Sequence, residues 1–272
     1  MVVFPIAKIN IGLRITGRRK DGFHDIETIF YPILLCDALE FVVSDQSENK
    51  DILQLTGIDP LSKPGDNLVM KSIMRLREIK SFPFLKVHLH KAIPVGAGLG
   101  GGSSDAACLL KTVSNHFDLK IKNNDLRSIA LEIGSDCPFF LDGIPSFGSG
   151  RGEILTTVNK VLTGLYLVLV NPGCRISTAD AYRNCKPEKP SVSLPDLFKL
   201  PFSDWKKLIL NDFEEFAFKK HPLIGDLKDI LYKSGALFSL MSGSGSSVYG
   251  IFSKKPDLPP KIKEYVIWEG GM

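Results

Sequence analysis

Apolar and polar side chains alternate along the first part of the chain. Every second residue from Ala7 to Ile15 is apolar, whereas Lys8 and Asn10 fall on the opposite face. A period of two is typical of a half-buried β-strand. The pattern predicts a strand over residues 2–15, a turn over residues 17–22 and a returning strand over residues 26–35, which together form a hairpin.

Farther along the chain, helical spacing and strand-like runs follow one another. The predicted elements are a helix over 67–79, a strand over 85–93, helices over 105–116 and 125–133, a strand or tight turn over 147–153, a buried strand over 165–170, two or three helices within 205–234, and strands within 236–252 on both sides of a glycine–serine loop over 242–247. Residues 44–66 read as polar loop with a short strand, 135–140 as an irregular connection and 187–201 as a loop. The weakest boundary between predicted elements lies near residue 155, where we place a domain boundary.

The most informative segment runs from Ile93 to Ala107 and reads IPVGAGLGGGSSDAA, with five glycines in seven positions. Glycine lets a backbone approach a ligand closely and adopt positive φ at little cost. The predicted helix starts at Asp105, and the first N–H groups of a helix have no internal partner. Unpaired donors at the positive end of a helix favour anions, so the segment predicts a phosphate site. A simple hairpin turn is the alternative, although two glycines would be enough for it.

Two common kinds of phosphate loop do not match this segment. No lysine follows Gly102, so the pattern G-x-x-x-x-G-K-[ST] is absent. A G-x-G-x-x-G string is nominally present from Gly96 to Gly101, but the acidic residue that a dinucleotide site needs about 20 residues later is missing. The loop therefore belongs to another class of phosphate-binding protein.

Composition and charge narrow the class of protein. A chain of 272 residues suits one large domain or two modest ones. The 34 Lys and Arg are spread among 30 Asp and Glu, without the dense basic cluster typical of nucleic-acid binding. The five cysteines form no C-x-x-C pair, which argues against a disulfide framework and a zinc site. No apolar run approaches the ~18 residues of a membrane span, and the N-terminus does not look like a signal peptide. We expect a soluble cytoplasmic protein.

Three strings resemble motifs of the GHMP kinases, which include galactokinase and the homoserine, mevalonate and phosphomevalonate kinases. They are PIAKINIGL at 5–13, PVGAGLGGGSSDAA at 94–107 and MSGSGSSVYGIF at 241–252. The longer string at 7–30, together with GSDCPFF at 134–140, GRGE at 150–153 and NPG at 171–173, is similar to the family members that phosphorylate a cytidine-diphosphate-linked sugar alcohol. The matches occur in order over nearly the whole chain, so they are more specific than any single glycine string.

The resemblance implies an α+β, two-domain GHMP kinase fold. It consists of an N-terminal ribosomal-protein-like domain over residues 1–154 and a C-terminal ferredoxin-like domain over residues 155–272, with the active site in the cleft between them. It also implies an ATP-dependent phosphotransferase that acts on the 2-hydroxyl of the sugar alcohol in isoprenoid (terpenoid) synthesis by the non-mevalonate pathway. ATP and Mg²⁺ are the implied cofactors, and the Mg²⁺ ligands stay open. No nucleic-acid or membrane partner is expected, and the protein would be a monomer or a homodimer.

The family motifs imply a role for particular residues. The ATP-binding residues would be Pro94, Val95, Gly96, Ala97, Gly98, Leu99, Gly100, Gly101, Gly102, Ser103 and Ser104, with Asn67 toward the adenine. Asp136 would accept the proton of the acceptor hydroxyl, and Lys8 would lie beside it, making the hydroxyl more acidic. The structural alternatives are a solvated strand lysine and a turn or helix-capping aspartate.

Recognition of the acceptor would involve Asn10, Phe23, His24 and Tyr182. Two aromatic rings can stack on a pyrimidine while a histidine reads its edge. The family usually has tyrosine where this chain has Phe23, so stacking is kept and a hydroxyl hydrogen bond is lost. The alternative is that Phe23 and Tyr182 belong to the core and that His24 is a turn residue.

Two other functions stay open at this stage. One is a GHMP kinase of the homoserine or mevalonate type, which would lack the RRKDGFH turn at 18–24. The other is a non-catalytic nucleotide- or RNA-binding module, because the N-terminal domain type resembles part of a ribosomal protein. The even spread of charge and the presence of Lys8 and Asp136 argue against it. The reactivity of Cys137 and the role of Arg151 are undecided.

Overall fold

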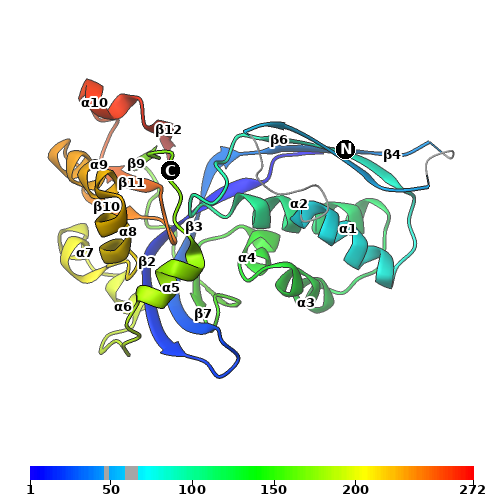
Figure 1. The fold of residues 1–272 in the computed structure, drawn as a ribbon, viewed down its shortest axis with the longest axis horizontal. Helices are drawn as coiled ribbons and strands as arrows, with labels where there is room; N and C mark the ends of the chain where they lie inside the picture. Colours follow the sequence, from blue (N-terminus) through cyan, green and yellow to red (C-terminus); the bar gives the residue numbers. More distant parts are fainter. Residues whose placement is uncertain (46–48, 59–66) are drawn as a thin grey trace. The chain divides into compact units, whose positions relative to one another are not determined.

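The computed structural model describes residues 1–45, 49–58 and 67–272 (Figure 1). It divides into two compact units. Unit 1 comprises residues 1–7, 34–95 and 100–144, and unit 2 comprises residues 8–33, 96–99 and 145–272. The predicted loop at 44–66 lies partly outside the described residues, but the short strand expected within it is present. The domain boundary at residues 154 and 155 stays a prediction.

Unit 1 contains a four-stranded sheet with the order β1-β4-β6-β5. Its strands are β1 (Val2–Val3), β4 (Ala38–Val43), β5 (Ile52–Gly57) and β6 (Leu85–Lys91), and its helices are α1 (Leu68–Ile79), α2 (Gly101–His116), α3 (Asn123–Ile133) and α4 (Cys137–Asp142). β4 is antiparallel to β6, whereas β5 is parallel to it, so β5, α1 and β6 form a βαβ unit.

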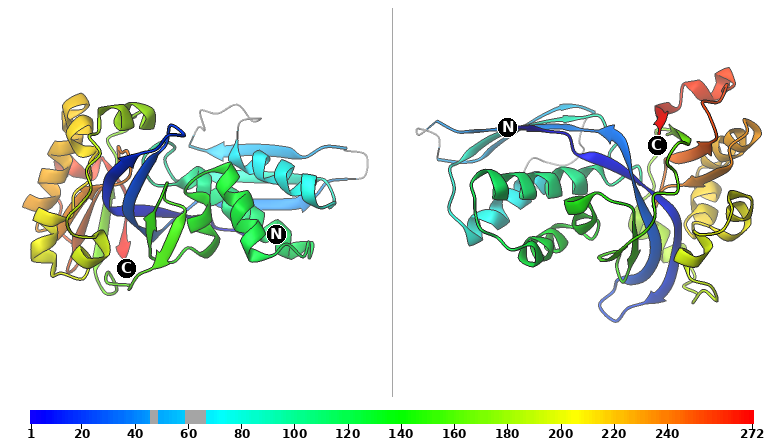
Figure 2. Two further views of the ribbon diagram at one scale, coloured as in Figure 1. Left: turned by 90° about the horizontal axis from the view of Figure 1, so that it is seen from below. Right: turned by 180° about the vertical axis from the view of Figure 1, so that it is seen from behind.

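The alternation of side chains on β6 determines which face of this sheet is buried. Leu85, Val87 and Leu89 are at most 2% exposed, whereas the residues between them reach solvent. The cyan helix α1 and the green helix α2 lie on the same side of the sheet in Figure 1 and in the right view of Figure 2. The apolar face of β6 therefore packs toward the helices, as its period of two predicts.

Unit 2 contains two further four-stranded sheets, with the orders β2-β3-β7-β8 and β10-β11-β9-β12. The first consists of β2 (Ile6–Arg18), β3 (His24–Cys36), β7 (Ser146–Ser149) and β8 (Ile154–Thr157), and the ends of β2 and β3 extend into unit 1. The second consists of β9 (Tyr166–Val170), β10 (Phe238–Met241), β11 (Val248–Phe252) and β12 (Val266–Gly271). The helices are α5 (Thr178–Asn184), α6 (Leu194–Leu197), α7 (Phe202–Leu208), α8 (Glu214–Lys220), α9 (Pro222–Lys233) and α10 (Pro260–Lys263).

The second sheet has the ferredoxin-like arrangement. Its strands occur along the chain as β9, β10, β11 and β12, with helices after β9 and β11, and every neighbouring pair is antiparallel. A βαββαβ chain with its first and third strands side by side in the centre is the ferredoxin-like topology. α8 and α9 contribute Ala217, Ile224 and Leu227 to the apolar core that backs this sheet.

Several predicted elements need correction. The long first strand is interrupted at Phe4 and Pro5, and α2 begins at Gly101, four residues before the predicted start. The connection predicted over 135–140 contains α4, and the loop predicted over 187–201 contains α6. Helices of four to six residues are too short to show a hydrophobic period, which explains why the sequence pattern missed them.

The prediction that the first long strand is half-buried was wrong. On β2 the polar residues are buried as well, with Lys8 3% and Asn10 2% exposed. Backbone and side chains of unit 2 cover the polar face: the Tyr249 hydroxyl donates to Asn10 O (3.0 Å), and Ser242 Oγ accepts from Asn10 N (3.1 Å). A polar face can be buried when its groups find hydrogen-bond partners.

Candidate phosphate-binding and phosphoryl-transfer site

The glycine loop connects β6 to α2 and presents a row of backbone N–H groups. Gly96, Gly98 and Gly100 have φ of +69°, +79° and +72°, and Gly100 is the N-cap of α2. Within the part of the chain that the structure describes, the N–H groups from Gly98 to Ser103 donate no hydrogen bond, whereas Ser104 N donates to Gly100 O (2.9 Å). Left-handed glycines that alternate with other conformations direct successive amides toward one side. Such amides at a helix N-terminus form an anion site.

Gly98 is required by a close approach within unit 2. A Cβ at this position would lie 1.9 Å from Ser242 O. The carbonyl oxygen of Gly98 accepts hydrogen bonds from Lys8 Nζ and from Ser242 Oγ, both at 2.9 Å. The glycine loop is therefore attached to β2 and to the glycine–serine loop over 242–247 through this one residue.

Asn211 fixes the glycine–serine loop, and the sequence interpretation missed it. Its Nδ2 donates to Met241 O and to Gly243 O, both at 2.8 Å, and its Oδ1 accepts from Phe213 N at 3.0 Å. It is 4% exposed. A single asparagine before an aspartate gives no signal of this role, because its partners come from a distant strand.

Lys8 is a buried cation on β2. Its Nζ donates to Asn10 Oδ1 and to Gly98 O and lies 5.5 Å from the centre of the Phe30 ring. Asn10 Nδ2 donates to Thr28 Oγ1 (2.8 Å), which in turn donates to Gly12 O (2.6 Å). Lys8 is 3% exposed, so the alternative of a solvated strand lysine is excluded. Burial of an ammonium group is costly, and the hydrogen bonds to Asn10 and Gly98 offset part of that cost.

Asp136 immediately precedes α4 in a turn that packs against the first turn of α2. A Cβ at Gly134 would lie 3.6 Å from Ser103 Oγ, and Cys137 N donates to Gly134 O (3.0 Å). Asp136 occupies the N-cap position of α4, but its side chain makes no capping hydrogen bond there. Of the two serines on α2, Ser103 is partly exposed and Ser104 is 2% exposed. Unit 1 thus brings Asp136 close to the serine end of the glycine loop.

Cys137 is a buried thiol. It is inaccessible to solvent, and burial raises its pKa to about 12, although a hydrogen bond with Ser103 opposes the rise. The thiolate is the reactive form of cysteine, and it is scarce at neutral pH when the pKa is this high. Cys137 therefore serves as packing between α4 and α2.

Asn67 lies at the N-terminus of α1. Its Oδ1 accepts from Val69 N (2.9 Å) and caps the helix. Leu68 Cδ1 would lie 3.8 Å from a Cβ at Gly102, so the first turns of α1 and α2 are neighbours within unit 1. The capping bond uses the side-chain oxygen of Asn67, which limits what this residue can offer to a nucleotide.

The aromatic residues predicted to bind a pyrimidine lie within unit 2. His24 and Tyr182 stack with ring centres 4.8 Å apart and planes 18° apart. Phe23 is 48% exposed, and the Arg151 guanidinium lies 3.9 Å from the centre of its ring. The structure therefore pairs Tyr182 with His24 and pairs Phe23 with Arg151. Burial, and next the positive charge of Arg18, lower the pKa of His24. A neutral imidazole offers one donor and one acceptor to a ligand.

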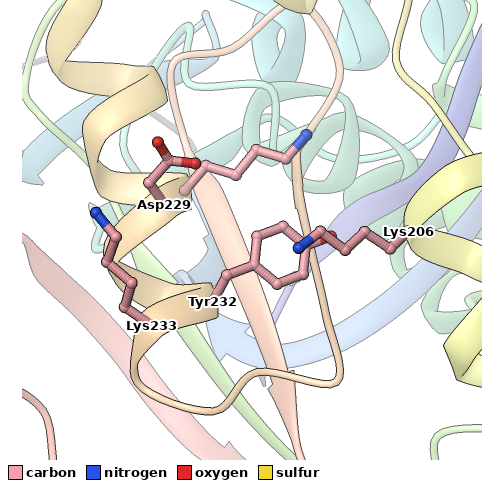
Figure 3. Close-up of a pocket in the computed structure, with 5 residues that line it drawn as sticks. Lys206, Asp229, Tyr232 and Lys233 are labelled. Atoms are coloured by element: carbon pink, nitrogen blue, oxygen red, sulfur yellow. The ribbon is translucent and has the colours of Figure 1, made fainter.

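A pocket of about 380 Å³ lies between α7 and α9 and is lined by none of the residues predicted from the motifs (Figure 3). Lys206 reaches over the Tyr232 ring, with its Nζ 4.2 Å from the ring centre, and Lys228 pairs with Glu214 at 2.6 Å. Asp229 and Lys233 complete the lining. None of these residues was predicted from the motifs, and two of the three lysines already have intramolecular partners.

Metal-binding clusters and membrane-spanning helices are both absent from residues 1–45, 49–58 and 67–272. No group of three or more His, Cys, Asp or Glu that could hold a metal ion was found there. Every helix in the same residues is too short or too polar to cross a bilayer.

The family models for the two halves of a GHMP kinase match this chain. The model described as "GHMP kinases N terminal domain" matches residues 67–143, and the one described as "GHMP kinases C terminal" matches residues 193–267. Together they cover more than half of the chain and include the glycine loop, Asp136 and the glycine–serine loop. The class defined by the fold and the site is therefore that of the GHMP kinases, which use ATP.

Individual relatives show to which group of GHMP kinases the chain belongs. The chain is 46% identical to a 4-diphosphocytidyl-2-C-methyl-D-erythritol kinase of Parabacteroides distasonis, over 100% of both chains, and 44% identical to that of Bacteroides thetaiotaomicron, over 95% of this chain and 94% of the relative. A crystal structure of a 4-(cytidine 5'-diphospho)-2C-methyl-D-erythritol kinase covers 92% of this chain and 90% of its own at 30% identity, with a TM-score of 0.74. The chain belongs to the 4-diphosphocytidyl-2-C-methyl-D-erythritol kinase family of GHMP kinases.

A more distant neighbour shows the fold alone. The mevalonate kinase of Methanococcus jannaschii has a TM-score of 0.67 at 14% identity and covers 97% of this chain and 92% of its own. The predicted α+β GHMP kinase fold is thereby confirmed.

Proposed function

We propose that this chain transfers the γ-phosphoryl group of ATP to the 2-hydroxyl of 4-diphosphocytidyl-2-C-methyl-D-erythritol. The names of its relatives at 44–46% identity over nearly full length support this acceptor. The observation that carries the proposal is the row of N–H groups from Gly98 to Ser103 that donate no hydrogen bond within the described residues. In the cell, such a reaction serves isoprenoid synthesis by the non-mevalonate pathway, and we place the enzyme in the cytoplasm.

The glycine loop binds the triphosphate in this proposal. Phosphoryl transfer passes through a loose transition state, so catalysis depends on positioning and on charge neutralisation rather than on covalent chemistry. Backbone amides fixed before the ligand arrives need no reorganisation when charge develops on the transferred group. Gly98 fixes the loop through its carbonyl oxygen, and α2 adds its N-terminal dipole.

Asp136 and Lys8 have separate roles in the proposed reaction. Asp136 accepts the proton of the acceptor hydroxyl as the phosphoryl group arrives, and its place in the turn beside Ser103 supports this role. Lys8 stabilises negative charge on the acceptor oxygen, and its hydrogen bonds to Asn10 Oδ1 and Gly98 O keep the ammonium in place.

A Mg²⁺ ion, when bound, would supply positive charge that neutralises the phosphates. Hard oxygen donors suit this ion, and Ser103 and Asp136 offer a hydroxyl and a carboxylate beside the start of α2. We therefore propose these two residues as its nearest protein groups.

The cytidine is held by the aromatic residues of unit 2 in this proposal. His24, in its neutral form, can exchange hydrogen bonds with the edge of a cytosine, and Tyr182 and Phe23 provide ring faces for stacking. In the structure His24 and Tyr182 contact one another directly, so a base that enters between them must move the rings apart.

An acceptor panel tests the proposed function. The purified chain is incubated with ATP and Mg²⁺ and one of three acceptors: 4-diphosphocytidyl-2-C-methyl-D-erythritol, mevalonate or homoserine. ADP release and the phosphorus NMR spectrum of the product are followed. We expect turnover with the cytidyl acceptor alone and a new phosphomonoester on its 2-hydroxyl. Faster turnover of mevalonate or homoserine by folded protein would refute the assignment.

A further inference from the structure

A buried network of charged residues lies directly behind the glycine loop in unit 1. Lys91 Nζ, at the end of β6, donates to Asp37 Oδ2 and to Asp105 Oδ2, the latter at 2.6 Å. Lys91, Asp37 and Asp105 are 4%, 1% and 2% exposed. The roles assigned to the glycine loop, Lys8 and Asp136 do not use any of these three residues.

The network joins the two ends of the loop. At the entry, Asp37 Oδ1 accepts from Ala92 N (2.6 Å) and from Ile93 N (2.8 Å). At the exit, Asp105 lies in the second turn of α2, and its carboxylate is bound to Lys91. The contact is close, because a Cβ at Gly101 would lie 3.2 Å from Lys91 Nζ.

The two carboxyl groups of the network are not equivalent. Both oxygens of Asp37 accept hydrogen bonds, three in total counting Lys91 and two amides. Asp105 Oδ1, in contrast, is buried and has no partner among the described residues. Asp37 is therefore bonded through both of its oxygens, whereas Asp105 is bonded to Lys91 through one.

We propose that Lys91, Asp37 and Asp105 form a buried clasp that holds the entry and the exit of the glycine loop together. The three residues are positioning residues: they act on the ATP phosphates through the loop amides. This role rests on the proposed use of the loop for ATP.

The first test measures the loop without any ligand. Lys91→Met removes both arms of the clasp, and Asp105→Ala removes the exit arm while the Lys91–Asp37 pair stays. Arg77→Met is the matched control, because Arg77 and Asp51 form a partly buried pair in the same unit, at the opposite end of β6. Amide hydrogen exchange of Ala92, Ile93 and Ser104, whose N–H groups donate hydrogen bonds at the two ends of the loop, reports whether these ends separate.

We expect exchange at these three amides to accelerate about 10-fold or more in Lys91→Met and less in Asp105→Ala, with no change in Arg77→Met. Asp105→Asn, which keeps an acceptor for Lys91 and no charge, should exchange like the unmodified chain. Unchanged exchange in Asp105→Ala, or equal acceleration in the Arg77→Met control, would overturn the clasp. This readout needs no turnover, so a failure of the proposed reaction is distinguishable from a failure of the clasp.

The second test measures nucleotide and cytidine affinity by calorimetry. A loosened loop should weaken ADP binding by about 10-fold in Asp105→Ala, because small displacements of positioned groups have large effects. Binding of cytidine diphosphate should stay within about 2-fold, since the aromatic residues belong to unit 2. Asp105→Asn should restore ADP affinity. Equal losses for both ligands would show a general destabilisation and contradict a positioning role.

Discussion

Single polar side chains determine how this site is assembled. Lys8, Asn10 and Lys91 are each less than 5% exposed, and each makes at least two hydrogen bonds. A buried polar group is tolerated when its partners satisfy it, and it then fixes one arrangement of the backbone around it. Loss of one partner leaves the other uncompensated, so substitutions here have effects beyond the contact removed.

Asp105 gives a pH-dependent prediction at this scale. Its pKa rises from 3.8 to about 8 in the folded chain, mainly because of burial. Between these pH values the folded chain keeps a proton that the unfolded chain has lost, so the contribution of Asp105 to stability decreases as pH rises. Asp105→Asn cannot ionise and should gain stability relative to the unmodified chain between pH 5 and pH 8. Urea unfolding at both pH values measures this, and a constant difference would contradict the neutral carboxyl.

Tyr182 gives a prediction about the acceptor. Tyr182→Ala removes a ring face and should raise the KM for the cytidyl acceptor about 5-fold or more, because stacking one base contributes ~1–3 kcal/mol. Tyr182→Phe keeps the ring and should behave like the unmodified chain. The KM for ATP should not change in either variant. A rise in the KM for ATP alone, measured by initial rates, would show that Tyr182 is not in the cytidine site.

At the scale of elements, the glycine loop is the part of the site that the sequence predicted best. The hydrogen bonds that hold this loop and the glycine–serine loop in place were not predicted. The density of glycines and the following helix predicted unpaired amides, and the structure shows them from Gly98 to Ser103 within the described chain. The helix begins at Gly101 instead of Asp105, and a Cβ at Gly101 would lie 2.9 Å from Ile93 Cγ2, so the first helical residue has no room for a side chain.

The burial of Lys91 could have been predicted from the alternation of side chains along β6. Lys91 continues the inward-facing series of Leu85, Val87 and Leu89, a position where a lysine is buried only with a partner. Asn211 left no such signal, since its bonds to Met241 and Gly243 depend on tertiary structure. Local periodicity predicts elements, whereas long-range hydrogen bonds appear only in the fold.

Two glycines of the loop provide a matched pair of variants. Gly96 and Gly98 both have left-handed φ. Among the described residues, a Cβ at Gly96 would meet nothing within 4 Å, whereas a Cβ at Gly98 would lie 1.9 Å from Ser242 O. Gly96→Ala should reduce the free energy of unfolding by about 1 kcal/mol through backbone strain alone. Gly98→Ala should reduce it by clearly more. Urea denaturation measures the free energy of unfolding of both variants. Equal decreases would mean that the close approach of Gly98 to Ser242 does not contribute to stability.

At the scale of the whole molecule, three motifs in order along the chain predicted the family, and the family models and relatives confirm it. The ferredoxin-like sheet order could not be derived from periodicity, because strand pairing between β9 and β12 joins residues about a hundred positions apart. The division into two units also interleaves segments of the chain, with residues 96–99 assigned to unit 2 between parts of unit 1.

Nucleotide binding should stabilise the whole chain. A ligand that binds only the folded state adds about 2.7 kcal/mol at 100 times its Kd, which raises the Tm. ADP should therefore raise the Tm of the chain in a concentration-dependent way, and it should do so less in the Asp105→Ala variant. Absence of any shift with millimolar ADP in differential scanning fluorimetry would contradict a phosphate-binding loop.

The most direct measurement is the kcat of Asp136→Asn with ATP, Mg²⁺ and 4-diphosphocytidyl-2-C-methyl-D-erythritol, alongside its ADP affinity. Asp142→Asn is the control, because Asp142 lies at the other end of α4 and pairs with Arg127 at the surface. We expect Asp136→Asn to lose at least ~10²-fold in kcat with ADP affinity retained, as for the loss of a general base, and Asp142→Asn to stay near the unmodified rate. An Asp136→Asn variant that turns over at the unmodified rate would contradict the proposal that Asp136 accepts the proton of the acceptor hydroxyl.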